Sequence, residues 1–346
     1  MKLKKILLRS VVLVVLLLCS LVIIYRDLVG YGWMQLKGQL TVVREAIPLE
    51  EFIALPTTTA EQKERVQVIL EAKAFAFDEL GINYSENYSS IFDQEGKPSM
   101  YVVTACDPFA FQPRLWSFPI VGSFPYKGFF DRGKAIEELE RVREEEKLDV
   151  GLRTAGGWST LGWFEDPVLS NMLNREEGDL AALIIHELTH GTLFVKDSVT
   201  FNENLANFIG DEGAELFLAK KYGRNSVELQ QYRDQRLDED KFRSYLLLSA
   251  KALDSLYKEV KELPDSLKQA LKDEQISLIK TSYDSVNFRS DRYIGYFDDY
   301  TPNNTFFMSM LRYNSQQEEL KRVLLEEFQG DLRAYLAYLK EKYPSL

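Results

Sequence analysis

Apolar residues recur every three or four positions through most of the chain, which is the spacing of buried helix faces. The clearest helix runs from Thr59 to Leu80. Thr59 and Gln62 have the spacing of a capping box, and Gly81 is suited to end the helix. The same pattern predicts helices over residues 133–147, 177–190, 200–215, 228–261 and 265–281, and over 304–339 with breaks near Asn314 and Gly330.

Short runs rich in β-branched and aromatic residues predict strands in front of the helix at 177–190. They cover residues 100–105, 115–122, 126–130 and 149–154, and a further β-like run follows at 192–195. Asp166 and Pro167 are expected to begin a short helix that reaches Leu173. We therefore predict an α+β fold that is mainly helical, with a small sheet in front of the helix at 177–190.

The first 25 residues follow a different pattern. A basic segment, residues 2–9, precedes a stretch from Ser10 to Tyr25 without any charged residue. This order predicts an uncleaved membrane anchor whose N-terminus stays in the cytoplasm while the rest of the chain is exported. The stretch is a little shorter than the roughly 20 residues that span a bilayer. Lipidation at Cys19 and removal as a signal peptide are open alternatives, although neither has small residues at the expected positions.

Composition narrows the class of partner. The chain carries 42 Lys+Arg against 53 Asp+Glu, a net charge of −11, which argues against a nucleic-acid partner because phosphates need a basic face. The hydrophobic content of 45% and charged content of 27% are those of an ordinary globular protein. Cys106 is the single cysteine outside the predicted anchor, so the core rather than disulfide bonds must stabilise the fold.

Residues His186-Glu187-Leu188-Thr189-His190 have the form H-E-x-x-H and contain both histidines of the chain. Positions i and i+4 lie one turn apart on the same helix face, so both imidazoles can bind one metal ion. Glu187 is placed to act as general base toward the water that such an ion activates. Asp179 is expected to cap this helix. A buried helix whose histidines only satisfy hydrogen bonds is the alternative.

A catalytic zinc ion keeps three protein ligands and one water, so the two histidines need a partner. With no third histidine and badly placed cysteines, the third ligand must be a carboxylate: Glu203, Glu212 or Glu215. We favour Glu203, with Glu212 second, because Asn202-Glu203-x-x-Ala206 opens a helix that can pack antiparallel against the first. The third ligand has the same N-E-x-x-A form in the thermolysin-like zinc peptidases.

Three further positions have two interpretations each. Asn207 follows Glu203 by one turn and either accepts the free ring N–H of a ligand histidine or is a surface amide. Gly156 and Gly157 precede a run of aromatic residues. They either line the path of an extended substrate or form a hairpin turn beside core aromatics.

Several further motifs extend over most of the predicted exported part. They are Gly38-Gln39-Leu40, residues 116–119 with 126–130, residues 159–169, Phe201-Asn202-Glu203, and Asn303-Asn304 before Tyr313. In these motifs and in H-E-x-x-H, the chain resembles the bacterial family of putative zinc aminopeptidases. Members of that family often carry cysteines at the positions of Ser117 and Ser123. They also often have a clearer lipidation signal, which is weakened here because Leu18 occupies the position before Cys19.

The resemblance implies a zincin-like fold of the gluzincin type, export, and one zinc ion per chain bound by His186, His190 and Glu203. It also makes Tyr313 and Asn304 candidates for stabilising the oxyanion of the tetrahedral intermediate. It implies peptides as substrates and a catalytic domain on the periplasmic side of the inner membrane.

We predict an anchor or signal at 1–26, a juxtamembrane segment at 27–58 and a zinc metallopeptidase domain at 59–346. That domain comprises an α/β part to about residue 175, metal-binding helices at 177–220 and a helical part at 225–346. The predicted function is a membrane-anchored zinc peptidase, an aminopeptidase by resemblance. Because no element of the G-x-M-E-N type is present to hold a free amine, a zinc endopeptidase is an alternative. A non-catalytic binding protein with a structural zinc is the other.

Overall fold

The computed structural model describes residues 12–13, 16, 20, 23–118, 122–154, 165–196 and 198–343. The chain divides into two units, Met1–Glu45 and Ala46–Leu346. In the first, α2 (Arg26–Glu45) is a helix of 20 residues. The predicted anchor lies largely outside the described residues, and none of the helices formed by the described part is both long and apolar enough to span a bilayer.

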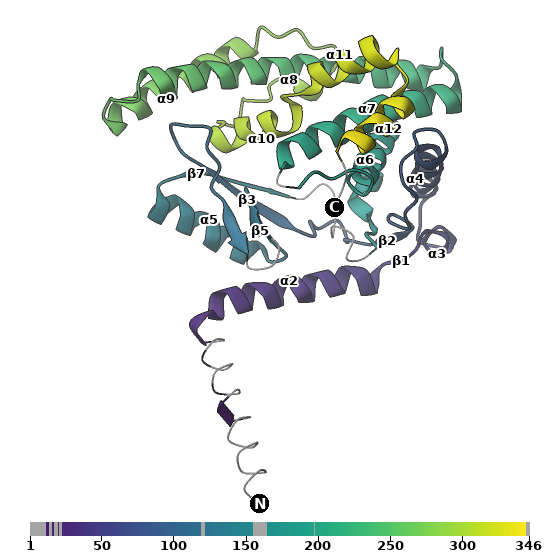
Figure 1. The fold of residues 1–346 in the computed structure, drawn as a ribbon, viewed down its shortest axis with the longest axis horizontal. Coiled ribbons are helices and arrows are strands. Elements are labelled where there is room, and N and C mark those ends of the chain that lie inside the picture. Colours follow the sequence, from purple (N-terminus) through teal and green to yellow (C-terminus); the bar gives the residue numbers. More distant parts are fainter. Residues whose placement is uncertain are drawn as a thin grey trace, which may run out of the picture. The chain divides into compact units, whose positions relative to one another are not determined.

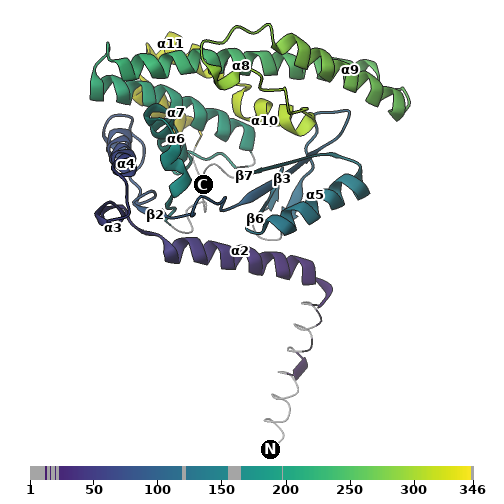
Figure 2. The ribbon, with the colours of Figure 1, turned by 180° about the vertical axis from the view of Figure 1, so that it is seen from behind.

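The second unit is mostly helical, and its described residues contain small sheets (Figures 1 and 2). Its helices are α3 (Leu49–Ala54), α4 (Ala60–Asp78), α5 (Arg132–Glu146), α6 (Glu177–His190), α7 (Val199–Tyr222), α8 (Val227–Glu259), α9 (Asp265–Tyr283), α10 (Asn304–Asn314), α11 (Gln317–Phe328) and α12 (Leu332–Lys342). Short 3₁₀ turns lie at Ser170–Asn174 and Asp291–Tyr293. The strands are β1 (Ile47–Pro48), β2 (Ser90–Phe92), β3 (Tyr101–Cys106), β4 (Trp116–Phe118), β5 (Gly122–Phe124), β6 (Lys127–Phe129), β7 (Asp149–Thr154) and β8 (Val168–Leu169).

The sheet that matters for the site has the order β6-β3-β7, with both pairs antiparallel. Its register places Tyr101 of β3 opposite Phe129 of β6 and opposite Thr154 of β7. Helix α5 covers one face of this sheet and α10 the other (Figure 1). Strands β2 and β8 pair in a separate small sheet with β1, and β4 pairs with β5.

Most predicted elements are confirmed, including the capping box of α4, in which Thr59 and Gln62 bond each other's backbone. Three predictions are wrong. Residues 192–195 form no strand, because their backbone groups bond locally: the Leu193 N–H donates to Thr189 O at 2.9 Å. The segment 166–173 forms β8 and a 3₁₀ turn instead of a helix. Asp179 does not cap α6, since the helix begins at Glu177; its carboxylate pairs with Arg292.

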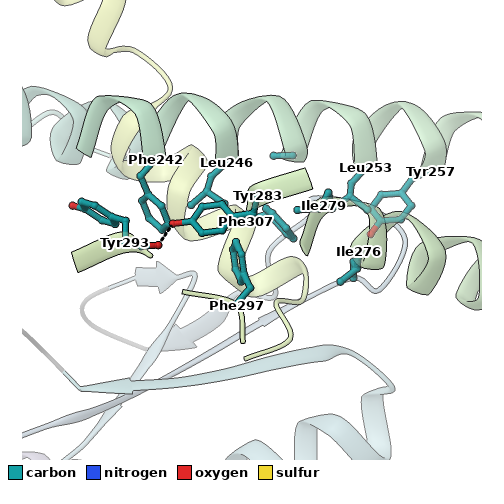
Figure 3. Packing of buried hydrophobic residues seen from close by; sticks show 11 residues of the cluster. Phe242, Leu246, Leu253, Tyr257, Ile276, Ile279, Tyr283, Tyr293, Phe297 and Phe307 are labelled. Atoms are coloured by element: carbon teal, nitrogen blue, oxygen red, sulfur yellow. Dashed lines mark hydrogen bonds between the residues drawn. The ribbon is translucent and has the colours of Figure 1, made fainter. Parts of the chain in front are cut away.

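A cluster of buried aromatic and aliphatic side chains joins α8, α9 and α10 (Figure 3). Tyr283 lies at its centre and donates its hydroxyl to Tyr293 O at 2.6 Å, so the buried phenol is satisfied. Phe307, which is fully buried, brings α10 into the cluster. Burying an aromatic ring of this kind contributes about 1.5–3 kcal/mol. The cluster therefore fixes α10 against α8 and, with it, the residues at the end of α10.

Helices α6 and α7 lie side by side and run antiparallel, as predicted. Glu203 lies near His190 at the end of α6, whereas Lys221 pairs with Glu177 at its start, 2.6 Å away. Between these contacts, Gly210 allows a close approach: a Cβ there would lie 2.6 Å from Ala182 O and 3.2 Å from the His186 Cβ. The missing side chain lets the backbone of α7 approach the turn of α6 that carries the first histidine.

Gly210→Ala is expected to lower the free energy of unfolding by about 1–3 kcal/mol, because the added methyl group must displace the backbone of α6. Denaturant unfolding followed by circular dichroism measures this. The matched control is Gly191→Ala, whose Cβ meets nothing nearer than Leu188 O at 3.6 Å; its effect should stay below about 1 kcal/mol. Equal stability of the two variants would contradict the close helix contact.

Candidate metal centre

Three side chains from two helices converge on one point. His186 and His190 come from successive turns of α6, and Glu203 comes from the N-terminal part of α7, just after its first turn. The Nε2 atoms of the two histidines are 3.1 Å apart, and Glu203 Oε2 lies 3.6 and 3.7 Å from them. In the described part of the chain, this is the group of His, Cys, Asp and Glu side chains whose ligand atoms come close enough to hold a metal ion.

The triangle fits a zinc ion. The point equidistant from its three corners lies about 2.0 Å from each atom, which is the bond length of zinc to an imidazole nitrogen or a carboxylate oxygen. Two histidines with one carboxylate are also a ligand set of catalytic zinc, which leaves a fourth position open. The side chains of the three residues are 13–18% exposed, so the site is reachable from solvent.

Burial and the neighbouring charges have opposite effects on the pKa values of the three side chains. Burial lowers the pKa of His186 to about 3, so its ring is neutral and its lone pair is available. Burial also acts to lower the pKa of His190, but the adjacent Glu203 outweighs it and the pKa is raised. For Glu203, burial favours the neutral acid, whereas the two histidines outweigh burial and lower the pKa of the carboxyl group.

Two buried asparagines hold Glu203 in place from either side. The Asn202 side chain makes a paired hydrogen bond with the backbone of Val195: its Oδ1 accepts from the N–H at 2.9 Å, and its Nδ2 donates to the carbonyl at 2.8 Å. Asn204 donates to Arg312 O at 2.5 Å and accepts from the Gln316 N–H at 2.8 Å. The carboxylate ligand is thus fixed both to the α6–α7 connection and to the end of α10.

Asn207 links the histidine to the same end of α10. Its side chain hydrogen-bonds the His186 side chain, an interaction that favours the protonated ring, and its Nδ2 donates to Tyr313 O at 3.1 Å. Asn207 is half-buried and has partners on both α6 and α10, so it is not a free surface amide. Such a partner fixes the orientation of a ligand ring.

Glu187 points to a separate group of residues. The Tyr88 hydroxyl donates to its Oε2 over 3.4 Å. Burial, together with the charges of Glu203 and Asp166 and against the opposing effects of His190 and Tyr88, raises the pKa of Glu187 to about 7. A carboxyl group that titrates near neutrality can both take up and release a proton. Tyr88 itself has a left-handed backbone with φ of 61°, which is unusual for an aromatic residue.

Two tyrosines and two arginines approach Glu203 from the sheet and from α10. Tyr313 forms a side-chain hydrogen bond with Arg153, and the charge of Glu203 acts on both Tyr313 and Tyr126. Burial raises the pKa of Tyr126 to about 12 and that of Tyr313 above its ordinary value. Both phenols therefore stay protonated at neutral pH. Arg312 completes this group, and its charge helps to lower the pKa of Glu203.

Comparison with known proteins places the chain in a family. A family model described as putative aminopeptidase matches residues 30–342. The chain belongs to this putative aminopeptidase family. Membership supports a peptidase-like function for the site. No curated protein and no solved structure shows significant similarity to the chain.

The structure places the remaining predicted residues elsewhere. Glu212 pairs with Lys321 at 3.5 Å, and Glu215 pairs with Arg233 at 2.7 Å, so neither joins the histidines. Gly156 and Gly157 lie outside the described residues.

Asn304 is fully buried, and its side chain has a different set of partners from those of an oxyanion site. Its Nδ2 donates to the carbonyls of Asp107 and Pro108, and its Oδ1 accepts from the Tyr257 hydroxyl at 2.7 Å. Because both amide N–H groups are engaged, the arrangement disfavours the predicted oxyanion role. Asn304 instead joins the start of α10 to the loop after β3.

Tyr88, Tyr126, Arg153 and Arg312 were not identified as site residues from the sequence. Tyr88 lies on a loop, Tyr126 next to β6, Arg153 on β7 and Arg312 on α10. Each reaches the site through contacts with residues far away in the sequence. A single sequence carries no signal that joins such distant positions.

Glu203→Ala is expected to weaken zinc binding by about 100-fold or more, because only two ligands would remain. Competition with a chromogenic chelator measures the affinity, and elemental analysis after dialysis measures the zinc content. Glu212→Ala is the matched control, since it removes a partly buried glutamate from the same helix outside the triangle. Equal zinc affinity in the two variants would exclude Glu203 as a ligand.

Proposed function

We propose that the protein is a zinc metallopeptidase that hydrolyses peptide bonds, and specifically an aminopeptidase. The observation that carries the proposal is the His186–His190–Glu203 triangle, with Glu187 in the same turn of α6. Family membership agrees with it. Zinc bound by these three residues would polarise the scissile carbonyl and lower the pKa of a water molecule.

The remaining chemistry falls to side chains of the chain itself. Glu187 accepts a proton from the attacking water and delivers it to the leaving amine, a role that suits its pKa of about 7. Tyr88 holds the carboxylate in position through its hydroxyl. Tyr313 and Tyr126, both protonated and next to Glu203, are the donors available to the developing oxyanion.

Glu187→Gln is expected to keep zinc and lose hydrolysis, because glutamine preserves shape and hydrogen bonding but accepts no proton. We expect kcat/KM to fall by about 100- to 10,000-fold, the range for a general base. The assay follows cleavage of a synthetic peptide library by mass spectrometry, with zinc content and thermal unfolding measured on the same samples.

Glu176→Gln is the control for that assay, because Glu176 precedes the same helix and its side chain is 70% exposed. Cleavage that survives in Glu187→Gln at the wild-type rate would remove Glu187 from the mechanism. Repeating the assay with N-acetylated peptides separates the two peptidase types: an aminopeptidase loses these substrates, whereas an endopeptidase cuts both sets equally.

The proposal includes a position at the membrane, supported by the basic segment followed by an uncharged stretch at the N-terminus. The full chain should stay with the membrane fraction after a carbonate wash, and protease added to spheroplasts should degrade it. Cys19→Ser tests lipidation, since an anchor is retained in this variant and a lipoprotein is released. Recovery of the wild-type chain in the soluble cytoplasmic fraction would contradict the proposed anchor.

A further inference from the structure

A cavity of about 130 Å³ lies between the β6-β3-β7 sheet and α10. The sheet lines it with Thr104, Gly151 and Arg153, and α10 lines it with Thr305, Ser309 and Arg312. The two arginines are the charged groups among its lining residues. The cavity is therefore a basic pocket with hydroxyl groups along its wall.

Arg312 is an unusual residue for such a wall. It is only 8% exposed, yet no Asp or Glu of the described residues forms an ion pair with it. Arg153 likewise has no carboxylate partner in the described part of the chain; its side chain hydrogen-bonds Tyr313. A buried guanidinium without a carboxylate at ion-pair distance is costly, and a second positive charge beside it adds repulsion.

The pocket borders the metal centre. Arg312 O accepts from Asn204, the neighbour of Glu203, and Tyr313 O accepts from Asn207, which bonds His186. The carboxylate whose charge acts on Arg312 is Glu203, which is also one of the three candidate metal ligands. A ligand in the pocket would therefore lie beside the proposed reaction centre.

We infer that Arg153 and Arg312 bind a carboxylate group of the peptide substrate, which makes acidic or short free-acid peptides the preferred class. Guanidinium groups pair with carboxylates through two parallel hydrogen bonds, and two arginines neutralised by one anion remove the repulsion between them. The inference rests on the proposed peptidase function. The carboxylate comes either from the C-terminus of a short peptide or from a Glu or Asp side chain.

The test compares three peptides of one sequence with the purified, zinc-loaded full chain. The first carries Gln and a free C-terminal carboxylate, the second Glu and a C-terminal amide, and the third Gln and the amide. We expect the wild type to favour either the first or the second over the third, and this preference identifies the source. In Arg153→Gln, the preference should fall by about 10- to 100-fold, as the loss of a charge-assisted hydrogen bond predicts.

Arg153 is exposed, so its replacement should not disturb folding. Arg312→Lys is the second variant: it keeps the charge but loses the planar fork, and it should weaken the same preference. Arg224→Gln, an exposed arginine on the α7–α8 turn, is the matched control and should keep the wild-type preference.

Two results would overturn the inference while leaving the peptidase intact. One is cleavage of all three peptides at equal rates by the wild type. The other is a preference that Arg153→Gln and Arg312→Lys both retain, which would limit the arginines to charge balance at Glu203. Absence of any cleavage that depends on Glu187 would instead overturn the proposed function.

Discussion

The distance between Glu203 and the two histidines depends on how closely α7 packs against α6. Three ligand atoms within 3.7 Å of one another require that the two helices meet at a fixed depth and register. Gly210 sets the depth, because any side chain there would meet the backbone of α6. Asn202 and Asn204 set the register, since their amides fasten the start of α7 on both sides of the carboxylate. The remaining architecture serves to keep this contact in place.

The aromatic cluster of α8, α9 and α10 contributes to the same contact from a distance. Phe307 fixes α10 to the cluster, and the end of α10 then supplies carbonyl groups to Asn204 and Asn207. At its other end, α10 is tied to the sheet, because Asp149 accepts from the Asn304 N–H and from Lys272 at 2.9 and 2.6 Å. A helix held at both ends carries its side chains with little freedom, which is the condition for a preorganised site.

What the sequence predicted well has a local physical cause. The H-E-x-x-H spacing follows from helix geometry, and the capping box of α4 follows from neighbouring residues. Glu203 was favoured as the third ligand because histidine and cysteine were excluded and the next helix offered only a few glutamates. The failures are of two kinds. Residues 192–195 have β-forming side chains, but local hydrogen bonds occupy the backbone groups that a strand would need. Asp179 lies close to the true start of α6, and boundaries of this kind are the least certain part of a pattern.

The site residues that the sequence did not predict were missed for a different reason. Tyr88 reaches Glu187 across 99 positions of the chain, and Arg153 meets Tyr313 across a far longer interval. Such contacts form only when the sheet, α6 and α10 have been assembled, so the hydrophobic periodicity of the sequence does not predict them.

The charges around the triangle show why this assembly matters. Glu187 and Asp166 lie beside Tyr88, whereas Arg153 of β7 and Arg312 of α10 act on Tyr126 and Tyr313. The surroundings of Glu203 therefore combine one group of acidic side chains with one group of basic side chains. Both groups are unfavourable for the protein alone, because one contains a buried carboxyl group whose pKa is raised to about 7 and the other a buried guanidinium without a carboxylate at ion-pair distance. Groups of this kind cluster at functional sites, which agrees with the proposed role of the His186–His190–Glu203 triangle.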